Sequence, residues 1–205
     1  MLVIVDYGVG NLESIRNMLK KTGTESTISS DQNIILEASK LILPGVGAFD
    51  TCASKLKQSG LIHAINQKVK EEKTPILGVC VGLQLLLEGS EEGVLPGLGW
   101  IKGKVVRFKQ ERMNGGFKIP HMGWSEVELP RSSSLFKDLD IRPRFYFVHS
   151  YYPELVDEYD ALVYANYGYP FVAGVEHENI LGVQFHPEKS HKFGMKLLDN
   201  FVKNY

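Results

Sequence analysis

Cys80 lies at the centre of the segment Gly78-Val-Cys-Val-Gly82, where an apolar run passes into residues with helical spacing. A nucleophile held on a sharp strand-to-helix turn needs neighbours without side chains two residues away, and glycine is present at both positions. The dipole and the free N–H groups at the start of the following helix would stabilise a thiolate. The segment therefore indicates either a nucleophilic thiol or a small side chain in the core.

A base for such a thiol is available in the segment His186-Pro187-Glu188. Pro187 favours an extended backbone at His186, and residues two apart in an extended segment point the same way. We therefore expect Glu188 to accept a hydrogen bond from one imidazole nitrogen, which leaves the other free to take the thiol proton. The alternative is a surface histidine beside a solvated glutamate. The spacing from His186 to His191 is not typical of zinc ligands, so we expect no metal.

Two backbone donors for an oxyanion are expected close to this thiol. The N–H of Val81 follows Cys80 directly, at the start of the expected helix. The segment Pro44-Gly-Val-Gly47 ends another apolar run, and loops at the carboxyl ends of parallel strands line the binding crevice. Glycine lets a peptide N–H turn toward a ligand at low steric cost, so this loop is a candidate for the second donor. A simple turn is the alternative.

Two further segments each have more than one interpretation. Residues 6–13 have the glycine pattern of a dinucleotide-binding fingerprint, but Glu13 replaces its third glycine and would face a pyrophosphate. This argues against a nucleotide-dependent oxidoreductase. Residues 145–152 form an aromatic run that ends in His149, Ser150 and Tyr151. These three residues either border a pocket or belong to a strand with one core-facing side.

In the first half of the chain, apolar runs alternate with segments of helical spacing. The predicted strands are residues 2–6, 40–43 and 75–79, and the segment 44–47 is expected to end the second of them. The predicted helices are residues 11–23 with Asn11 as a candidate cap, 50–72 with an interruption near residues 59–60, and 81–88. This alternation predicts a parallel sheet with helices on its faces.

The second half, after about residue 97, consists mainly of strand-like runs separated by turn residues. These runs are residues 100–109, 116–129, 144–152, 161–167, 171–177 and 180–185. Only residues 191–204 have the spacing of a long helix, whose apolar stripe consists of Phe193, Leu197, Leu198 and Phe201. The sequence therefore predicts a single α/β domain over residues 1–205, with a mostly parallel central sheet, flanking helices and an antiparallel β extension in the C-terminal half.

The composition argues against several classes of protein. The chain has 205 residues, 43% of them hydrophobic, and 23 basic against 24 acidic side chains give a formal net charge of −1. Neither nucleic acid nor an anionic membrane is expected as the main partner. The start of the chain has no basic leader, and no run approaches the ~20 apolar residues of a membrane span. Because Cys52 and Cys80 make no disulfide framework, we expect a cytoplasmic protein with reduced thiols.

Taken together and in this order, the motifs resemble those of the class I, or triad, glutamine amidotransferases. The segments that carry the resemblance are Pro44-Gly-Val-Gly47, Gly78-Val-Cys-Val-Gly-Leu-Gln84 and His186-Pro-Glu188. Further segments resemble the glutaminase subunits of imidazole glycerol phosphate synthases, namely residues 6–12, 120–124, 146–151 and 182–190. The resemblance spans nearly the whole chain. It implies a flavodoxin-like α/β fold and no cofactor.

The resemblance also implies roles for individual residues in the hydrolysis of glutamine to glutamate and ammonia. Cys80 would be the nucleophile, His186 the general base and then acid, and Glu188 the residue that orients the imidazole. The oxyanion hole would consist of Val46, Gly47 and Val81. The glutamine substrate would be held by Gly45, Gln84, His149, Ser150 and Tyr151. Asn11 and Lys189 match positions that face the partner subunit in this family.

A partner subunit is expected because ammonium is not a nucleophile, so ammonia used in a synthesis must avoid bulk solvent. The rest of the chain offers no convincing phosphate loop for a phosphorylated acceptor. The resemblance implies a heterodimer with a (β/α)8-barrel synthase that forms imidazole glycerol phosphate and an aminoimidazole carboxamide ribotide in histidine biosynthesis. It also implies low glutaminase activity without that partner.

The sequence departs from the family pattern at three positions. Val81 stands where leucine is frequent, Leu83 where methionine is frequent, and Ser125 where asparagine is usual. The first leaves a backbone donor unchanged, whereas Ser125 weakens the assignment to one pathway. Two alternatives therefore stay open: a related glutaminase that supplies ammonia for amidino sugars of surface polysaccharides, and an inactive regulatory or binding module on the same scaffold.

Overall fold

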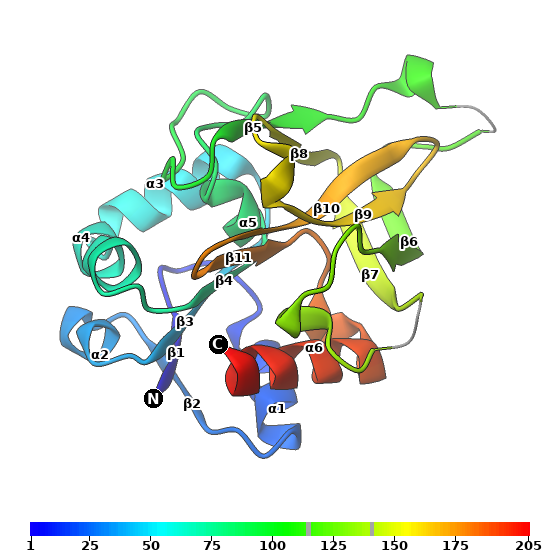
Figure 1. Cartoon of the computed structure of the whole chain (residues 1–205). Helices are drawn as coiled ribbons and strands as arrows, with labels where there is room; N and C mark the ends of the chain where they lie inside the picture. The colour runs from blue at the N-terminus through cyan, green and yellow to red at the C-terminus, as the bar shows by residue number, and fades with distance from the viewer. Residues whose placement is uncertain (114–115, 140–141) are drawn as a thin grey trace.

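A nine-stranded mixed sheet forms the centre of the computed structural model, which describes residues 1–113, 116–139 and 142–205 (Figure 1). In these residues the strand order is β2-β1-β3-β4-β11-β10-β9-β6-β7. The strands are β1 (Leu2–Val5), β2 (Ser26–Ser29), β3 (Lys40–Gly45), β4 (Ile76–Cys80), β6 (His121–Glu128), β7 (Arg144–His149), β9 (Ala161–Asn166), β10 (Pro170–His177) and β11 (Ile180–Val183). A second sheet pairs β5 (Gly103–Arg107) with β8 (Tyr151–Leu155).

Five neighbouring strands, β2, β1, β3, β4 and β11, run parallel to one another. All residues of β1, β4 and β11 are buried, as expected of strands that are covered on both faces. The helices are α1 (Leu12–Lys21), α2 (Gln32–Leu36), α3 (Phe49–Gln58), α4 (Ile62–Asn66), α5 (Val81–Leu85) and α6 (His191–Asn204). Figure 1 shows α1 and α6 together on one side of the sheet, with α3 and α4 on the other. The predicted parallel sheet with flanking helices is confirmed.

The other strands of the large sheet form the predicted antiparallel extension. β10 pairs antiparallel with β11 and β9, and β6 pairs antiparallel with β9 and β7. β11 connects the two parts, because it runs parallel to β4 on one side and antiparallel to β10 on the other. The last strand of the chain therefore lies beside the strand that ends at Cys80.

The single strand predicted over residues 144–152 is wrong. The chain bends at Ser150, and β7 and β8 on either side of it belong to different sheets. The bend is fixed by a hydrogen bond from the backbone N–H of Phe108 to the carbonyl of Ser150, at 3.0 Å. Because aromatic residues stand on both sides of Ser150, the sequence pattern does not indicate the bend.

Two boundaries near the thiol also differ from the prediction. Pro44 does not end β3, because Pro44 and Gly45 still pair with Val79 and Cys80 of β4. The proline is tolerated because the ladder to β1 stops at Ile42, so no N–H is required on that side. The second difference is that α5 ends at Leu85 rather than at residue 88. The carbonyls of Leu86 and Leu87 accept hydrogen bonds from the backbone N–H groups of residues 99–101 instead of continuing the helix.

The remaining predicted helices are present, and one further α-helix and one further strand occur within the part of the chain that the structure describes. The break expected near residues 59–60 separates α3 from α4, and Gly60 there has a φ of 74°. A π-helical turn, Gln67–Glu71, continues α4. β2 and α2 were not expected, because both are short and β2 contains mostly polar residues. None of the helices in the described ranges has the length and apolar character to cross a membrane.

Candidate active site

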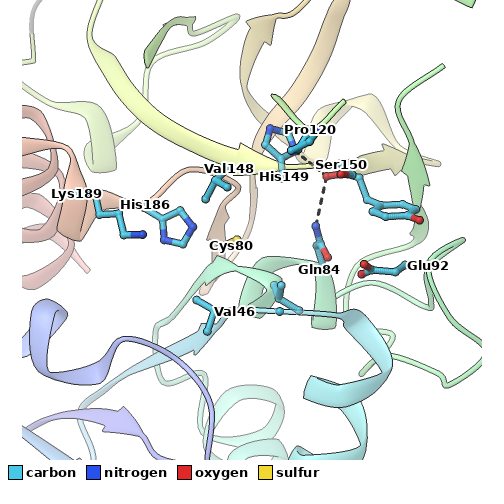
Figure 2. Close-up of a pocket in the computed structure, with 13 residues that line it drawn as sticks. Val46, Cys80, Gln84, Glu92, Pro120, Val148, His149, Ser150, His186 and Lys189 are labelled. Carbon is cyan, nitrogen blue, oxygen red and sulfur yellow. Dashed lines mark hydrogen bonds between the residues drawn. The ribbon is translucent and has the colours of Figure 1, made fainter. Parts of the chain in front are cut away.

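A pocket of about 370 Å³ lies at the carboxyl ends of β3, β4 and β11, which are neighbours in the parallel part of the sheet. Because these strands run in the same direction, the loops that follow them meet at one edge. Figure 2 shows the side chains around the pocket. Its wall consists of Val46, Gly47, Cys80, Val81, Gln84, Glu92, Pro120, Val148, His149, Ser150, Tyr151, His186 and Lys189.

Cys80 is the last residue of β4 and precedes the first turn of α5, with φ 56° and ψ −113°. This backbone conformation is unfavourable for a residue with a side chain and is held by the packing around it. A Cβ at Gly78 would lie 2.8 Å from the Gly82 carbonyl oxygen, and a Cβ at Gly82 would overlap the carbonyl oxygen of Leu43. Gly78 is therefore needed for α5 to pack against β4, and Gly82 for α5 to pack against β3, so both positions require glycine as predicted.

His186 lies beside Cys80 and is almost completely buried. Its Nδ1 is 2.8 Å from Oε1 of Glu188, and its ring lines the pocket together with Cys80. Burial, the largest effect, lowers the pKa of His186, but the hydrogen bonds and charges of Cys80 and Glu188 outweigh it and raise the pKa to about 10. The raised pKa favours the protonated imidazole, whose Nδ1 lies against the Glu188 carboxylate.

The contact between His186 and Glu188 was predicted, but the backbone that makes it differs from the prediction. His186 is extended, with φ −102° and ψ 95°, whereas Pro187–Lys189 forms a 3-10 turn. This turn brings the carboxylate back to the ring, so an extended segment is not required. Glu188 does not line the pocket but lies behind His186, with 2% of its side chain exposed.

The backbone of His186 is fixed from two directions. Its N–H donates to the Tyr146 carbonyl at 2.9 Å, and its carbonyl accepts from Oγ of Ser190 at 2.6 Å. The same hydroxyl oxygen accepts from the backbone N–H of Tyr146 at 3.0 Å. Because Ser190 is completely buried, this bridge between β7 and the turn leaves the imidazole little freedom to shift.

The residues expected to form an oxyanion hole all line the pocket and come from two segments, the start of α5 and the loop after β3. Val81 occupies the first turn of α5, where backbone N–H groups have no acceptor within the helix. Val46 and Gly47 follow β3; Val46 is 40% exposed and Gly47 has a φ of 96°. Gly45 does not line the pocket, because it is buried in β3 opposite Cys80.

One wall of the pocket, formed by Gln84, His149, Ser150 and Tyr151, is organised around the backbone carbonyl of Tyr151. This carbonyl accepts from Nδ1 of His149 at 2.8 Å and from Nε2 of Gln84 at 3.4 Å. A carbonyl oxygen can only accept, so the proton of His149 lies on Nδ1 and its Nε2 is an acceptor. Burial, together with a smaller effect of neighbouring histidines, lowers the pKa of His149 to about 3, so the ring is neutral.

His121 supports this wall and was not identified from the sequence. It lies opposite His149 in the β6–β7 ladder, and its Nδ1 is 3.1 Å from Nε2 of His149. Its Nε2 is 2.8 Å from Oγ of Ser125, and its ring stacks between Phe147 and Tyr167. Burial lowers the pKa of His121 to about 4. The two histidines are paired by the register of β6 and β7, and this register cannot be read from the sequence.

Three lining residues were also missed, namely Glu92, Pro120 and Val148. Glu92 lies outside the predicted helices and strands, so its position could not be inferred from the sequence. Its Oε2 accepts a hydrogen bond from the backbone N–H of Phe49 at 2.8 Å. This contact joins the start of α3 to a turn 43 residues away, so no local pattern indicates it. Glu92 gives the pocket a carboxylate near Gln84 (Figure 2).

The two predicted partner-facing residues are both exposed. Asn11 precedes α1 but makes no side-chain capping bond, contrary to the expectation of a cap; only its carbonyl accepts, from Ile15 N–H at 3.3 Å. Lys189 reaches the pocket, and its Nζ lies 5.8 Å from the centre of the Tyr146 ring. No cluster of three or more His, Cys, Asp or Glu side chains suited to a metal occurs within the described residues.

The arrangement is that of an acyl-transfer site. A thiol beside an imidazole, with a carboxylate on the far ring nitrogen, can attack a carbonyl carbon and return a proton to the leaving group. A family model described as "Glutamine amidotransferase class-I" matches residues 3–205. The chain belongs to the class-I glutamine amidotransferase family. This membership confirms the sequence-based resemblance and the prediction of a glutamine amidotransferase enzyme.

Curated relatives match this class-I glutamine amidotransferase over nearly its full length. "Imidazole glycerol phosphate synthase subunit HisH 2" of Methanococcus maripaludis is 51% identical over 203 residues, which is 99% of each chain. The protein of the same name from Pseudomonas aeruginosa is 47% identical over 99% of each chain. The subunit HisH of Leptospira interrogans is 45% identical over 98% of this chain and 99% of the relative.

Solved structures share the fold at low sequence identity. A crystal structure of a glutamine amidotransferase superposes with a TM-score of 0.73 and 20% identity, covering 98% of this chain and 97% of the other. PurLQS from Thermotoga maritima gives a TM-score of 0.74 at 18% identity, covering 98% and 96%. These likenesses confirm the predicted fold class.

Proposed function

We propose that this chain hydrolyses the side-chain amide of glutamine to glutamate and ammonia, with Cys80 as nucleophile, His186 as proton carrier and Glu188 as its orienting partner. The observation that supports this most directly is the arrangement of these three side chains. Cys80 is held in a strained turn at the pocket, in contact with an imidazole whose other nitrogen is 2.8 Å from a buried carboxylate.

The reaction would proceed through a thioester. The Cys80 sulfur attacks the amide carbon of glutamine, and His186 gives its proton to the nitrogen as the carbon–nitrogen bond breaks, which releases ammonia. His186 then removes a proton from water, the hydroxide adds to the thioester carbon, and glutamate leaves as the sulfur–carbon bond breaks. Glu188 remains hydrogen-bonded to the ring and stabilises the imidazolium in both steps.

The charges of the pocket suit an amino acid whose side chain ends in an amide. Glu92 offers a carboxylate for the α-ammonium group, and Lys189 offers a cation on the other side of the pocket. The N–H of Val81 and a peptide N–H of the loop at Val46 and Gly47 would hold the developing oxyanion. Gln84 and the bend at Ser150 would hold the rest of the substrate.

The ammonia would be used by a separate subunit. The relatives at 45–51% identity are named as subunits of imidazole glycerol phosphate synthase, which supports the same assembly and histidine biosynthesis for this chain. We propose a heterodimer with a (β/α)8-barrel synthase, in which Asn11 and Lys189 face the partner. The whole chain would act as one glutaminase domain in the cytoplasm.

Glutamate release, measured with and without the barrel synthase subunit, tests this proposal. We expect slow hydrolysis by the chain alone, faster hydrolysis with the partner, and none with Cys80→Ala, whose far-UV circular dichroism should match the wild type. Loss of folding in Cys80→Ala, as for a truncated core side chain, would contradict the nucleophile assignment.

The same preparation separates the other candidate functions. A glutamine-like electrophile should label Cys80 in the complex, and absence of the adduct would indicate an inactive module. Hydrolysis without formation of imidazole glycerol phosphate would point instead to another acceptor, such as a sugar that receives an amidino group.

A further inference from the structure

Gln184 brings a second polar side chain to the Cys80 sulfur. It follows the last residue of β11, is completely inaccessible to solvent, and does not line the pocket. Its Nε2 lies 3.8 Å from Sγ of Cys80, within hydrogen-bonding distance for sulfur. The register of the sheet explains this position, because β11 pairs with β4 up to Val183 opposite Val79. Gln184 and Cys80 are therefore the next residues along two neighbouring parallel strands.

The orientation of the Gln184 amide is determined by its neighbours. The Tyr151 carbonyl can only accept, so the group of Gln84 that faces it at 3.4 Å must be the NH₂ group. The same Nε2 of Gln84 donates to Oε1 of Gln184 at 3.1 Å. Because this contact holds the oxygen of Gln184, its NH₂ group is turned toward the Cys80 sulfur. One backbone carbonyl thus sets the direction of both amides.

This donor is best satisfied when Cys80 is ionised. A buried amide N–H without an acceptor costs free energy, and a neutral thiol is a weak acceptor. A thiolate is a stronger acceptor, because hydrogen bonds to charged groups are about twice as strong as neutral ones. The imidazole of His186 beside the sulfur can take up and release a proton, whereas the amide of Gln184 can only donate a hydrogen bond. His186 can therefore transfer the thiol proton, and Gln184 can only stabilise the charge on the sulfur.

We propose that Gln184 is a further active-site residue, whose side-chain N–H donates to the Cys80 sulfur and stabilises the thiolate before attack. This inference rests on the proposed role of Cys80 as the nucleophile. Gln84 positions the Gln184 amide and also lines the pocket, so the pocket and the sulfur are joined by two hydrogen-bonded side chains.

Alkylation of Cys80 by iodoacetamide as a function of pH tests the inference without requiring glutaminase activity. Trypsin separates the two cysteines, because Cys52 falls in peptide 41–55 and Cys80 in peptide 74–102. The variant Gln184→Met keeps the length of the side chain and removes the donor. We expect the midpoint of Cys80 alkylation to rise by about one pH unit and kcat/KM for glutamine in the complex to fall about tenfold. The exposed Gln58→Met is the matched control and should change neither.

The possible outcomes distinguish this inference from the proposed function. A midpoint that is unchanged in Gln184→Met would overturn the inference and leave only a packing role, even if glutamine hydrolysis remained normal in the wild type. If Gln184→Met failed to fold, Gln184→Leu would decide by the same measurement. A shifted midpoint together with no hydrolysis by the wild-type complex would support the hydrogen bond and contradict the glutaminase proposal.

Discussion

At the scale of single residues, two buried neutral imidazoles form a pair at the pocket wall, with His149 lining the pocket and His121 behind it. His121 and His149 face each other across β6 and β7, and burial lowers the pKa of each, to about 4 and about 3. An unfolded chain has no such burial, so its histidines titrate near their ordinary pKa of about 6.5. Folding therefore competes with protonation of these two rings below that pH.

We predict that the free energy of unfolding decreases as the pH falls from about 6.5 toward 4. In this window the unfolded state binds protons that the folded state does not, so the stabilisation is complete above 6.5 and is lost on acidification, by about 2 kcal/mol per histidine at pH 5. The raised pKa of His186 has the opposite sign, since its contribution is complete below 6.5 and is lost as the pH rises toward 10.

Urea denaturation at pH 7.5, 6 and 5 measures how steeply the free energy of unfolding falls as the pH is lowered. His121→Phe should make the loss about half as steep, because the phenyl ring can still stack between Phe147 and Tyr167 but does not titrate. The exposed His63→Gln is the control and should keep the wild-type slope. A slope in His121→Phe equal to that of the wild type would mean that other groups cause the acid sensitivity.

Local spacing explains which site residues could be predicted. Cys80 with its glycines, and His186 with Glu188, belong to short segments whose own backbone brings the groups together. Gln184 was in a recognised segment, but its partners come from β4 and α5, and their register is absent from the sequence. His121 was missed for the same reason, whereas Glu92 was missed because its contact with Phe49 joins residues 43 apart in the sequence.

At the scale of elements, the turn between β4 and α5 depends on the close approach of β3. A Cβ on Gly82 would overlap the Leu43 carbonyl oxygen, which is part of the sheet backbone and cannot rotate away. A Cβ on Gly89, by contrast, would have its nearest neighbour at 3.9 Å, an ordinary contact. Packing therefore requires glycine at position 82, whereas a side chain at position 89 would fit.

We predict that Gly82→Ala lowers the free energy of unfolding by at least about 2 kcal/mol, because the turn must move away from β3. Gly89→Ala should change it by less than about 0.5 kcal/mol. Thermal unfolding of the two variants measures the difference. Equal melting temperatures would show that the turn adjusts without cost, and the strained backbone of Cys80 would then need another explanation.

The elements themselves were largely predictable, and their ends were not. Continuous apolar runs indicated β1, β3 and β4, and the apolar stripe of residues 191–204 matched α6 at both ends. The bend at Ser150 and the end of α5 at Leu85 are set by hydrogen bonds from distant residues, so the local pattern does not contain them. β2 is an edge strand with polar residues, which have weak strand signals.

At the scale of the whole molecule, α1 and the turn that carries Glu188 belong to one region. α1 contacts both the Pro187–Lys189 turn and α6, although these segments lie at opposite ends of the sequence. Asn11 and Lys189 are exposed there. A partner that covered this region would contact the turn behind the imidazole directly, which offers a physical route for stimulating hydrolysis.

We predict that Asn11→Ala weakens binding of the barrel synthase about fivefold or more, with little effect on the fold. An asparagine that caps a helix contributes about 1 kcal/mol, but the Asn11 side chain makes no capping bond, so less than about 0.5 kcal/mol should be lost. Isothermal titration calorimetry measures the affinity, and thermal unfolding measures the stability.

Asn17 is exposed on the same helix, so Asn17→Ala is the control for both measurements. Unchanged affinity in Asn11→Ala would place the partner elsewhere, whereas a large loss of stability would mean that Asn11 acts within the chain.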